Sequence, residues 1–176
     1  MGNRTSEELV EAYTDNYRFP AGSVTEEMVM RHWALEQELT NELLKLSPDE
    51  RWDTFERCYS RLYGELTWLN EIARPTLETD PKVVYRSIIS LLTPHDRRVY
   101  EIGSGKRSLI AYLASQGFQC KATEITRERG EKWVDDTPNL TWGVTDGVHP
   151  DRFEEHDAWD VVISNHVIEH MHQDDL

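Results

Sequence analysis

The segment that decides the fold reads Arg98-Val99-Tyr100-Glu101-Ile102-Gly103-Ser104-Gly105. Its first five residues predict a β-strand at 98–102. The glycines that follow let the backbone turn tightly and let a ligand approach without a Cβ in the way. The free N–H groups of such a turn favour an anionic ligand group. An apolar stretch at 109–116 then predicts a helix, so the segment begins a β-α-β unit.

The same alternation continues to the end of the chain. Further strands are predicted at 119–124, 140–144 and 159–164, and a further helix around 127–134. A short helix at 80–92 precedes the first strand. Strands that alternate with helices form parallel β-α-β units, whose strands are buried on both faces. We therefore predict the α/β class, with a Rossmann-like parallel sheet of about four strands.

Residues 1–75 have a different, helical periodicity. Helices are expected from Thr5 to about Phe19, from about Thr25 to Leu46, and from Pro48 to Leu69. The third carries a stripe of apolar residues at steps of three and four, which we interpret as core rather than as a ligand box: Trp52, Phe55, Tyr59, Leu62, Leu66 and Leu69. The second and third helices are expected to form an antiparallel hairpin. The prediction is an all-helical N-terminal region at 1–75, serving as a lid or as a packing and dimerisation module, followed by a ligand-binding domain at 76–176.

Composition narrows the choice of partners and compartment. The 176 residues carry a formal net charge of −14, which repels phosphate backbones, so no nucleic-acid partner is expected. No apolar run approaches the length of a membrane span, and the polar N-terminus does not resemble a signal peptide. Cys58 and Cys120 are the two cysteines, and this usage is typical of a reduced, cytoplasmic protein. We expect no metal site.

Two nucleotide-binding patterns fit the glycine turn poorly. A P-loop would need glycine at position 100 and serine or threonine at 107, where the chain has Tyr100 and Arg107. A nicotinamide-binding G-x-G-x-x-G would place its third glycine at 108, which is Ser108. Glu124 lies twenty-one positions after Gly103, at the end of the second strand. There a carboxylate can accept hydrogen bonds from both hydroxyls of a ribose, which indicates an adenosine cofactor.

Four segments together resemble the class I S-adenosylmethionine (SAM)-dependent methyltransferases. Residues 99–105 resemble motif I of that family, 122–125 motif II, 142–147 motif III and 159–170 motif IV of its small-molecule members. The resemblance covers residues 80–176, with the motifs in the family's order. It implies that SAM is the cofactor. Carried over position by position, it implies that Glu101, Gly103 and Gly105 surround the methionine part, Glu124 binds the ribose, Asp146 contacts the adenine amino group, and Asn165 and His166 lie near the cofactor.

The resemblance also implies the reaction, an SN2 methyl transfer. Motif IV lacks the Asn/Asp-Pro-Pro-Tyr sequence of methyltransferases that act on adenine or glutamine amino groups. Together with the acidic charge, this favours a small-molecule, sugar or lipid-linked acceptor methylated at oxygen. His166 or His170 is a candidate general base, because neutral imidazole accepts protons near physiological pH. The alternative is a hydrogen-bonded histidine that shapes the pocket.

Two departures from the family pattern matter. Arg107 replaces the usual third glycine, and we expect it to face solvent, the alternative being a pairing with the cofactor carboxylate. The family fold also has three further strands after motif IV, so we expect this sequence to be a fragment or to be completed by a partner. The fourth strand would then be an exposed edge, through which, or through the N-terminal helices, the chain could form homo-oligomers. A non-catalytic SAM-binding module is the competing hypothesis.

A zinc site is the remaining alternative. His166-Val167-Ile168-Glu169-His170 matches H-x-x-E-H, a zinc-peptidase pattern in which a helix places two histidines one turn apart. The pattern needs a third protein ligand and leaves the three upstream motifs unexplained, so we expect a zinc hydrolase less than a methyltransferase.

Overall fold

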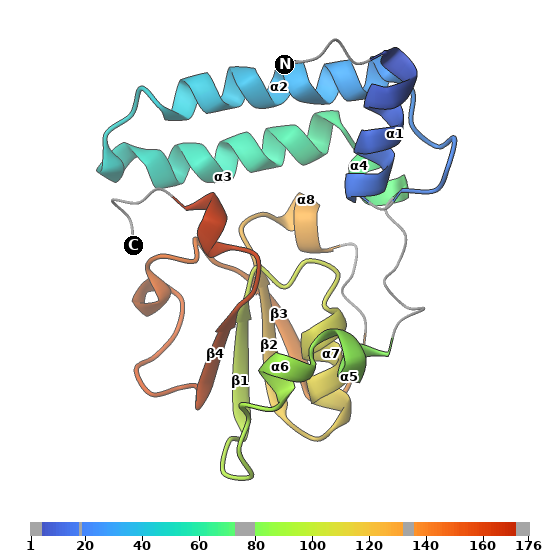
Figure 1. Cartoon of the computed structure of the whole chain (residues 1–176). Coiled ribbons are helices and arrows are strands. Elements are labelled where there is room, and N and C mark those ends of the chain that lie inside the picture. Colours follow the sequence, from blue (N-terminus) through green and yellow to red (C-terminus); the bar gives the residue numbers. More distant parts are fainter. Residues whose placement is uncertain (1–4, 18, 73–79, 132–135, 172–176) are drawn as a thin grey trace. The chain divides into compact units, whose positions relative to one another are not determined.

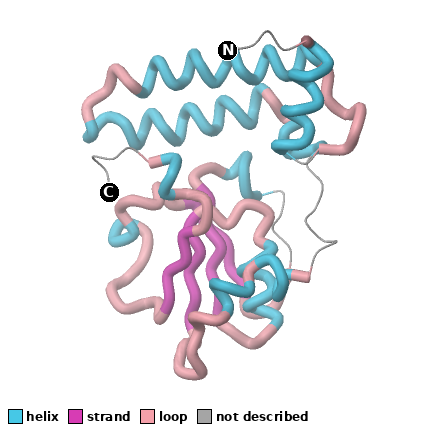
Figure 2. Tube along the Cα trace, viewed as in Figure 1, coloured by secondary structure: helices cyan, strands magenta, loops and turns pink. Residues whose placement is uncertain are grey.

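The computed structural model describes residues 5–17, 19–72, 80–131 and 136–171 (Figure 1). The chain divides into two compact units, Met1–Pro75 and Thr76–Leu176. Each has its own buried cluster of apolar side chains. The first unit is helical, and the second has an α/β fold (Figure 2).

Four helices make up the first unit: α1 (Ser6–Tyr17), α2 (Glu26–Leu43), α3 (Pro48–Glu65) and α4 (Trp68–Ile72). The start of α2 is capped by Thr25, whose Oγ1 accepts a hydrogen bond from the backbone N–H of Met28 (3.3 Å). A capping box of Ser47 and Glu50 starts α3. These are the starts that the sequence predicts.

The sequence prediction that the third helix continues to Leu69 is wrong. Helix α3 ends at Glu65, Leu66 leaves the helical conformation (φ −113°, ψ 57°), and α4 begins at Trp68. Gly64 weakens the last turn, because glycine costs about 1 kcal/mol in a helix relative to alanine. The chain bends there while Leu66 and Leu69 stay buried, so the apolar spacing continues across two helices.

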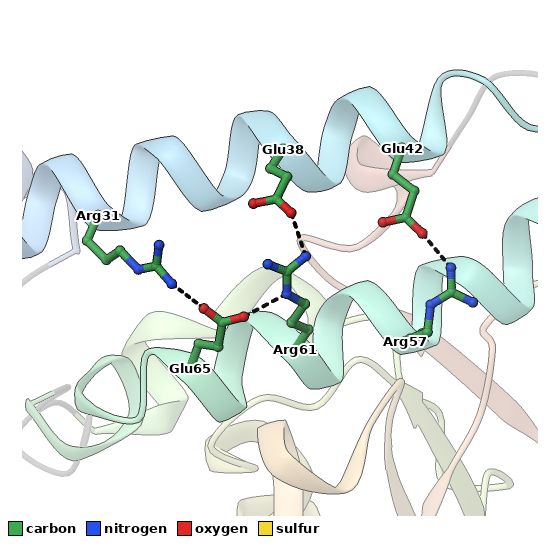
Figure 3. A network of polar contacts seen from close by, with 6 residues as sticks. All are labelled: Arg31, Glu38, Glu42, Arg57, Arg61 and Glu65. Carbon is green, nitrogen blue, oxygen red and sulfur yellow. Dashed lines mark hydrogen bonds and ion pairs between the residues drawn. The ribbon is translucent and has the colours of Figure 1, made fainter.

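Ion pairs show that α2 and α3 are antiparallel (Figure 3). Arg31 near the start of α2 pairs with Glu65 at the end of α3, and Glu42 near the end of α2 pairs with Arg57. Between them the Arg61 guanidinium contacts Glu38 (2.8 Å) as well as Glu65 (2.6 Å). The hairpin that the sequence predicts is therefore confirmed, and ion pairs link its two helices.

The core of the first unit lies between its helices. It consists of eight buried side chains: Phe19, Val24, Val29, Leu35, Leu39, Cys58, Leu66 and Leu69. Trp52, Phe55 and Tyr59 are half-buried instead and form a row of contacting rings along α3. Of the predicted stripe, Leu66 and Leu69 are thus fully in the core, and Leu62 packs against it half-buried.

We expect Thr25→Ala to destabilise the first unit by about 1 kcal/mol, because the substitution removes the α2 cap. Thr40→Ala is the matched control, since Thr40 is exposed within the same helix and alanine has the higher helix propensity there. Urea denaturation of both variants measures the effect. Equal stability of the two would show that the cap contributes nothing.

The second unit starts with two single-turn helices, α5 (Pro81–Val84) and α6 (Arg86–Ile89), where the sequence predicts one helix. Tyr85 interrupts them with φ −104° and ψ 20°. The remaining elements are β1 (Arg98–Ile102), α7 (Ser108–Ser115), β2 (Gln119–Glu124), α8 (Arg127–Gly130), β3 (Leu140–Val144) and β4 (Val161–Ser164), with 3₁₀ turns at Pro150–Arg152 and Ile168–His170. The predicted continuation of α8 to 134 lies outside the described residues.

The four strands form one parallel sheet in the order β3-β2-β1-β4. This confirms the predicted α/β, Rossmann-like sheet. The core of this unit joins the sheet to α7 through eight buried side chains: Val99, Leu109, Ile110, Leu113, Ala114, Cys120, Ala122 and Ile163. The strand order reverses at β1, since β2 lies on one side of it and the later β4 on the other. In open α/β sheets, ligands bind outside the carboxyl ends of the strands at such a switch point.

Strand β4 forms one edge of the sheet. Among the described strands it pairs with β1 alone, and its Val162 side chain is 59% exposed. Asp160, directly before β4, accepts hydrogen bonds from the backbone N–H groups of Arg97 and Arg98 (2.8 Å each) and from the Arg98 guanidinium (2.6 Å). These bonds fasten the start of β4 to the start of β1 and hold the pKa of Asp160 below its ordinary range.

None of the helices in the described ranges combines the length and apolar character that crossing a membrane requires.

Candidate functional site

The candidate site lies at the carboxyl ends of β1 and β2, next to the switch point. After β1 the chain turns through Gly103 (φ 66°) and Gly105 (φ 54°), in the left-handed region that glycine adopts without strain. The backbone N–H of Ser104 donates to the carbonyl of Thr123 in β2 (2.8 Å), which ties the turn to the neighbouring strand. Both predicted glycines therefore lie in the turn between β1 and α7.

Arg107 contradicts the expectation that it faces solvent. Its side chain is buried, with 3% of the residue exposed, and its backbone is left-handed (φ 61°, ψ 21°). Its N–H donates to the carbonyl of Ser104 (2.8 Å) and closes the turn directly before α7. Arg107 thus takes the conformation that glycine prefers, so the turn keeps a glycine-like path without the third glycine.

Glu101 is a buried acid at the start of this turn. Only 4% of the residue is exposed, and its Oε2 has no hydrogen-bond partner within the described ranges. Burial, followed by the repulsion of Glu124, raises the pKa of Glu101 to about 8. A buried acceptor without a donor costs free energy, so this atom is suited to receive a donor from a ligand.

Glu124 lies at the end of β2, as predicted, and faces the same turn. Its Oε1 accepts a hydrogen bond from the backbone N–H of Gly105 (2.5 Å). Burial raises the pKa of Glu124, and the positive charge of Arg129 opposes that rise. Arg129 belongs to α8 and is a site residue that the sequence analysis missed. No motif position marks it, and only the fold of α8 brings it to Glu124.

The residues around the turn can be tested for their fit to SAM. Besides Glu101 Oε2, the buried hydroxyl of Ser104 has no hydrogen-bond partner in the part of the chain that is described. A carboxylate and a hydroxyl at a glycine turn suit the amino and carboxylate groups of a methionine moiety. The side chains present therefore fit the proposed ligand.

Trp142 on β3 and Glu124 on β2 both lie next to Gly130 of α8. A Cβ on Gly130 would lie 2.7 Å from Cζ2 of Trp142 and 2.9 Å from Cγ of Glu124, so only glycine fits between them. Arg127 stacks over the indole at 6.0 Å. The buried indole N–H of Trp142 has no acceptor among the described residues. Gly130 was not singled out by sequence, and Trp142 only as the first residue of the motif III segment, because their fit appears only when α8 lies against β3.

Asp146 follows β3, where motif III predicts it, but its carboxylate is engaged by its own loop. Oδ1 accepts from the backbone N–H groups of Val148 (2.9 Å) and His149 (2.8 Å), and Oδ2 contacts Nδ1 of His149 (2.9 Å). Burial favours a higher pKa for Asp146, but these hydrogen bonds from His149 and Val148 outweigh it and lower the pKa. The predicted contact with adenine stays a prediction.

Three further predicted residues lie after β4. Asn165 directly follows the strand and is half-buried. His166 has a left-handed backbone (φ 57°), and its Nδ1 lies 3.1 Å from Oε1 of Glu169. His170 is exposed at the end of a 3₁₀ turn. Val167 covers the glycine turn, because a Cβ on Gly103 would lie 2.3 Å from its Cγ2.

This geometry does not favour the zinc alternative. The H-x-x-E-H pattern needs one α-helix that carries both histidines, whereas His166 is left-handed and only Ile168–His170 form a 3₁₀ turn. Across the described residues, no group of three His, Cys, Asp or Glu side chains could hold a metal ion.

Comparisons with known proteins give one structural similarity. The chain resembles the crystal structure of a TehB-like SAM-dependent methyltransferase from Corynebacterium glutamicum, with 17% sequence identity and a TM-score of 0.45. The alignment covers 70% of this chain and 61% of that protein's chain. No family model and no curated protein matches the sequence.

Proposed function

We propose that this chain binds SAM at the carboxyl ends of β1 and β2 and transfers its methyl group to a hydroxyl of a small molecule. The observation that carries the proposal is the buried carboxylate of Glu101, whose Oε2 has no partner in the described structure, beside a glycine turn. A second buried carboxylate, Glu124, lies at the end of the neighbouring strand. The four motifs in family order support the same ligand.

Each site residue has a defined task under this proposal. Glu101 accepts hydrogen bonds from the amino group of the methionine moiety, and Gly103 and Gly105 leave room for it. Glu124 accepts from the ribose hydroxyls, which requires it to share or release its bond to the N–H of Gly105. Asn165 lines the ligand near β4.

SAM supplies an electrophilic methyl group on a positively charged sulfur. The protein then has to hold the acceptor in line behind that group and exclude water, and positioning alone can supply several kcal/mol of the barrier. Glu124, and Glu101 once it gives up its proton to pair with the ligand, add negative charge in a buried setting, which complements the cationic ligand. His166 and His170 are candidate bases for the acceptor hydroxyl, and the net charge of −14 favours a small acceptor over a nucleic acid.

A non-catalytic SAM-binding module is the second candidate, because the glycine turn with Glu101 and Glu124 accounts for binding of the cofactor alone. The two functions predict different products. A methyltransferase converts labelled SAM and a mixture of small hydroxyl compounds into labelled methyl ethers, whereas a binding module leaves SAM unchanged.

Calorimetric titration with SAM and S-adenosylhomocysteine (SAH) tests the proposal. We expect saturable binding, weakened at least about tenfold by Glu124→Ala, because hydrogen bonds to a charged group contribute about 1.5–3 kcal/mol. Glu155→Ala is the matched control, since Glu155 is exposed in a loop of the same unit. No binding by a chain that circular dichroism shows to be folded would refute the SAM site.

A further inference from the structure

The loop after β3 crosses the carboxyl ends of two neighbouring strands. At its start the N–H of Thr145 donates to the carbonyl of Glu124, the last residue of β2 (2.9 Å). Two residues later, a Cβ on Gly147 would lie 3.2 Å from Cγ2 of Ile102, the last residue of β1, and 3.1 Å from Cε of Met171, which follows β4. The loop therefore reaches the switch point between β1 and β4 just before His149.

Asp146 builds this loop and fixes the ring of His149. Two backbone N–H groups of the loop donate to Oδ1, while Oδ2 is left for Nδ1 of His149 at 2.9 Å. An ionised carboxylate can only accept hydrogen bonds, so Nδ1 of the neutral ring carries the proton. Nε2 then has the lone pair, and His149 is held in one tautomer and one orientation, as a base must be.

Exposure argues against His166, the histidine that the sequence motif suggests as base. The His166–Glu169 pair also joins Nδ1 to a carboxylate, at 3.1 Å. However, its side chains are 85% and 51% exposed, against 34% and 16% for His149 and Asp146. Exposed pairs are screened by water and contribute little, whereas a partly buried pair anchored by two backbone N–H groups keeps its geometry.

We propose that His149 is the general base of the reaction and that Asp146 is its positioning residue. This inference rests on the proposed methyl transfer to a hydroxyl. The acceptor oxygen forms the bond to the methyl carbon, the carbon–sulfur bond breaks, and its electron pair stays on sulfur as the thioether of SAH. The hydroxyl proton moves to Nε2 of His149, and the imidazolium later releases it to water.

Asp146→Asn tests the dyad without removing the loop. The amide oxygen can keep the two backbone hydrogen bonds, but the amide nitrogen now donates to Nδ1 of His149 and forces the proton onto Nε2. In ¹⁵N NMR spectra of the folded protein, we expect the Nδ1–H tautomer in the unmodified chain and the Nε2–H tautomer in the variant. His149→Gln assigns the signals, and an unchanged tautomer would overturn the proposal.

Glu169→Gln is the matched control for that spectrum. His166 has the same type of partner but an exposed ring, so solvent rather than the glutamate sets its tautomer. We expect no reversal of the His166 tautomer in this variant. A reversal equal to that of His149 would show that any neighbouring carboxylate fixes a histidine tautomer. It would overturn the argument that the Asp146–His149 pair is held in place by its loop.

Protection by SAH tests whether His149 belongs to the ligand site. Diethyl pyrocarbonate acylates imidazole nitrogens that have a lone pair, and mass spectrometry locates the product. With SAH at ten times its dissociation constant, about nine-tenths of the sites are filled, so we expect acylation of His149 to slow by up to about tenfold. SAH that binds by calorimetry but does not slow this reaction would overturn the inference and leave the SAM site intact. Failure of SAH to bind would remove the proposed function and the inference with it.

Discussion

Glu101→Gln should stabilise the second unit at alkaline pH, by up to about 5 kcal/mol once Glu101 of the unmodified chain is fully ionised. The pKa of this carboxyl is about 8 in the folded chain, against an ordinary value of 4.5. Between these values the folded state holds a proton that the unfolded state has released. The contribution of Glu101 to stability is therefore complete below about pH 4.5 and is lost as the pH rises through about 8.

Glutamine resembles the protonated acid and does not titrate, so the variant escapes this loss. Urea denaturation at pH 5 and pH 9 measures the difference, which we expect to be small at pH 5 and large at pH 9. Glu155→Gln is the control, since Glu155 is exposed in a loop of the same unit. Parallel loss of stability in Glu101→Gln and the unmodified chain would contradict the buried, protonated state of Glu101.

The same proton couples ligand binding to pH. If the amino group of SAM pairs with Glu101, the carboxyl must give up its proton, so affinity should rise as the pH approaches 8. Calorimetry in two buffers with different ionisation enthalpies detects the released proton. In Glu101→Gln we expect weaker binding without this pH dependence, whereas an equal dependence in both chains would assign the proton to another group.

Gly103→Ala should cost about 2–3 kcal/mol and abolish SAM binding. A left-handed backbone costs a non-glycine residue about 1 kcal/mol, and the new methyl group would lie 2.3 Å from Cγ2 of Val167. Val167 or the turn itself must then move, and a displaced turn no longer presents the site to the ligand. Urea denaturation and calorimetric titration with SAH measure the two effects.

Two variants separate the causes. Gly117→Ala introduces a left-handed alanine (φ 92°) with nothing within 4 Å of its Cβ, so it should show the backbone cost alone. In the double variant Gly103→Ala, Val167→Ala the clash is relieved, and the double-mutant cycle should show a favourable coupling between the two sites. Additive effects would mean that Val167 does not press on the turn.

Local patterns explain how much of this fold the sequence predicts. The strands from β1 to β3 and helix α7 lie within a residue of their predicted bounds, because the turn and loop residues between them are local signals. The break at Leu66 was missed, since its apolar spacing continues in α4. The same apolar spacing fits one straight helix and two helices joined by a bend. Tertiary contacts, which the spacing does not show, decide between them.

The site was predictable in its positions but not in its contacts. Glu101 and Glu124 lie at the glycine turn, as the motif spacing implies. Burial of Arg107 could not be read from the sequence, because an arginine in a turn is usually exposed and its burial depends on the packed turn. Asp146 and His149 are three positions apart, but this spacing alone does not predict that their side chains meet. The contact depends on the hydrogen bonds that fix the loop.

The hydrogen bonds between Asp160 and the start of β1 affect the order in which the strands around the site come together. Val99 pairs with a β2 partner about 20 residues away and with a β4 partner about 60 residues away, so closing the second loop costs about 1 kcal/mol more entropy. Strand β4 is therefore the one expected to dock last during folding, and Asp160 offsets the cost by fastening it to β1. Val167 follows β4 and can cover the glycine turn only afterwards. We therefore expect the turn of Gly103 to be covered, and the ligand site to be complete, only after β4 has docked on β1.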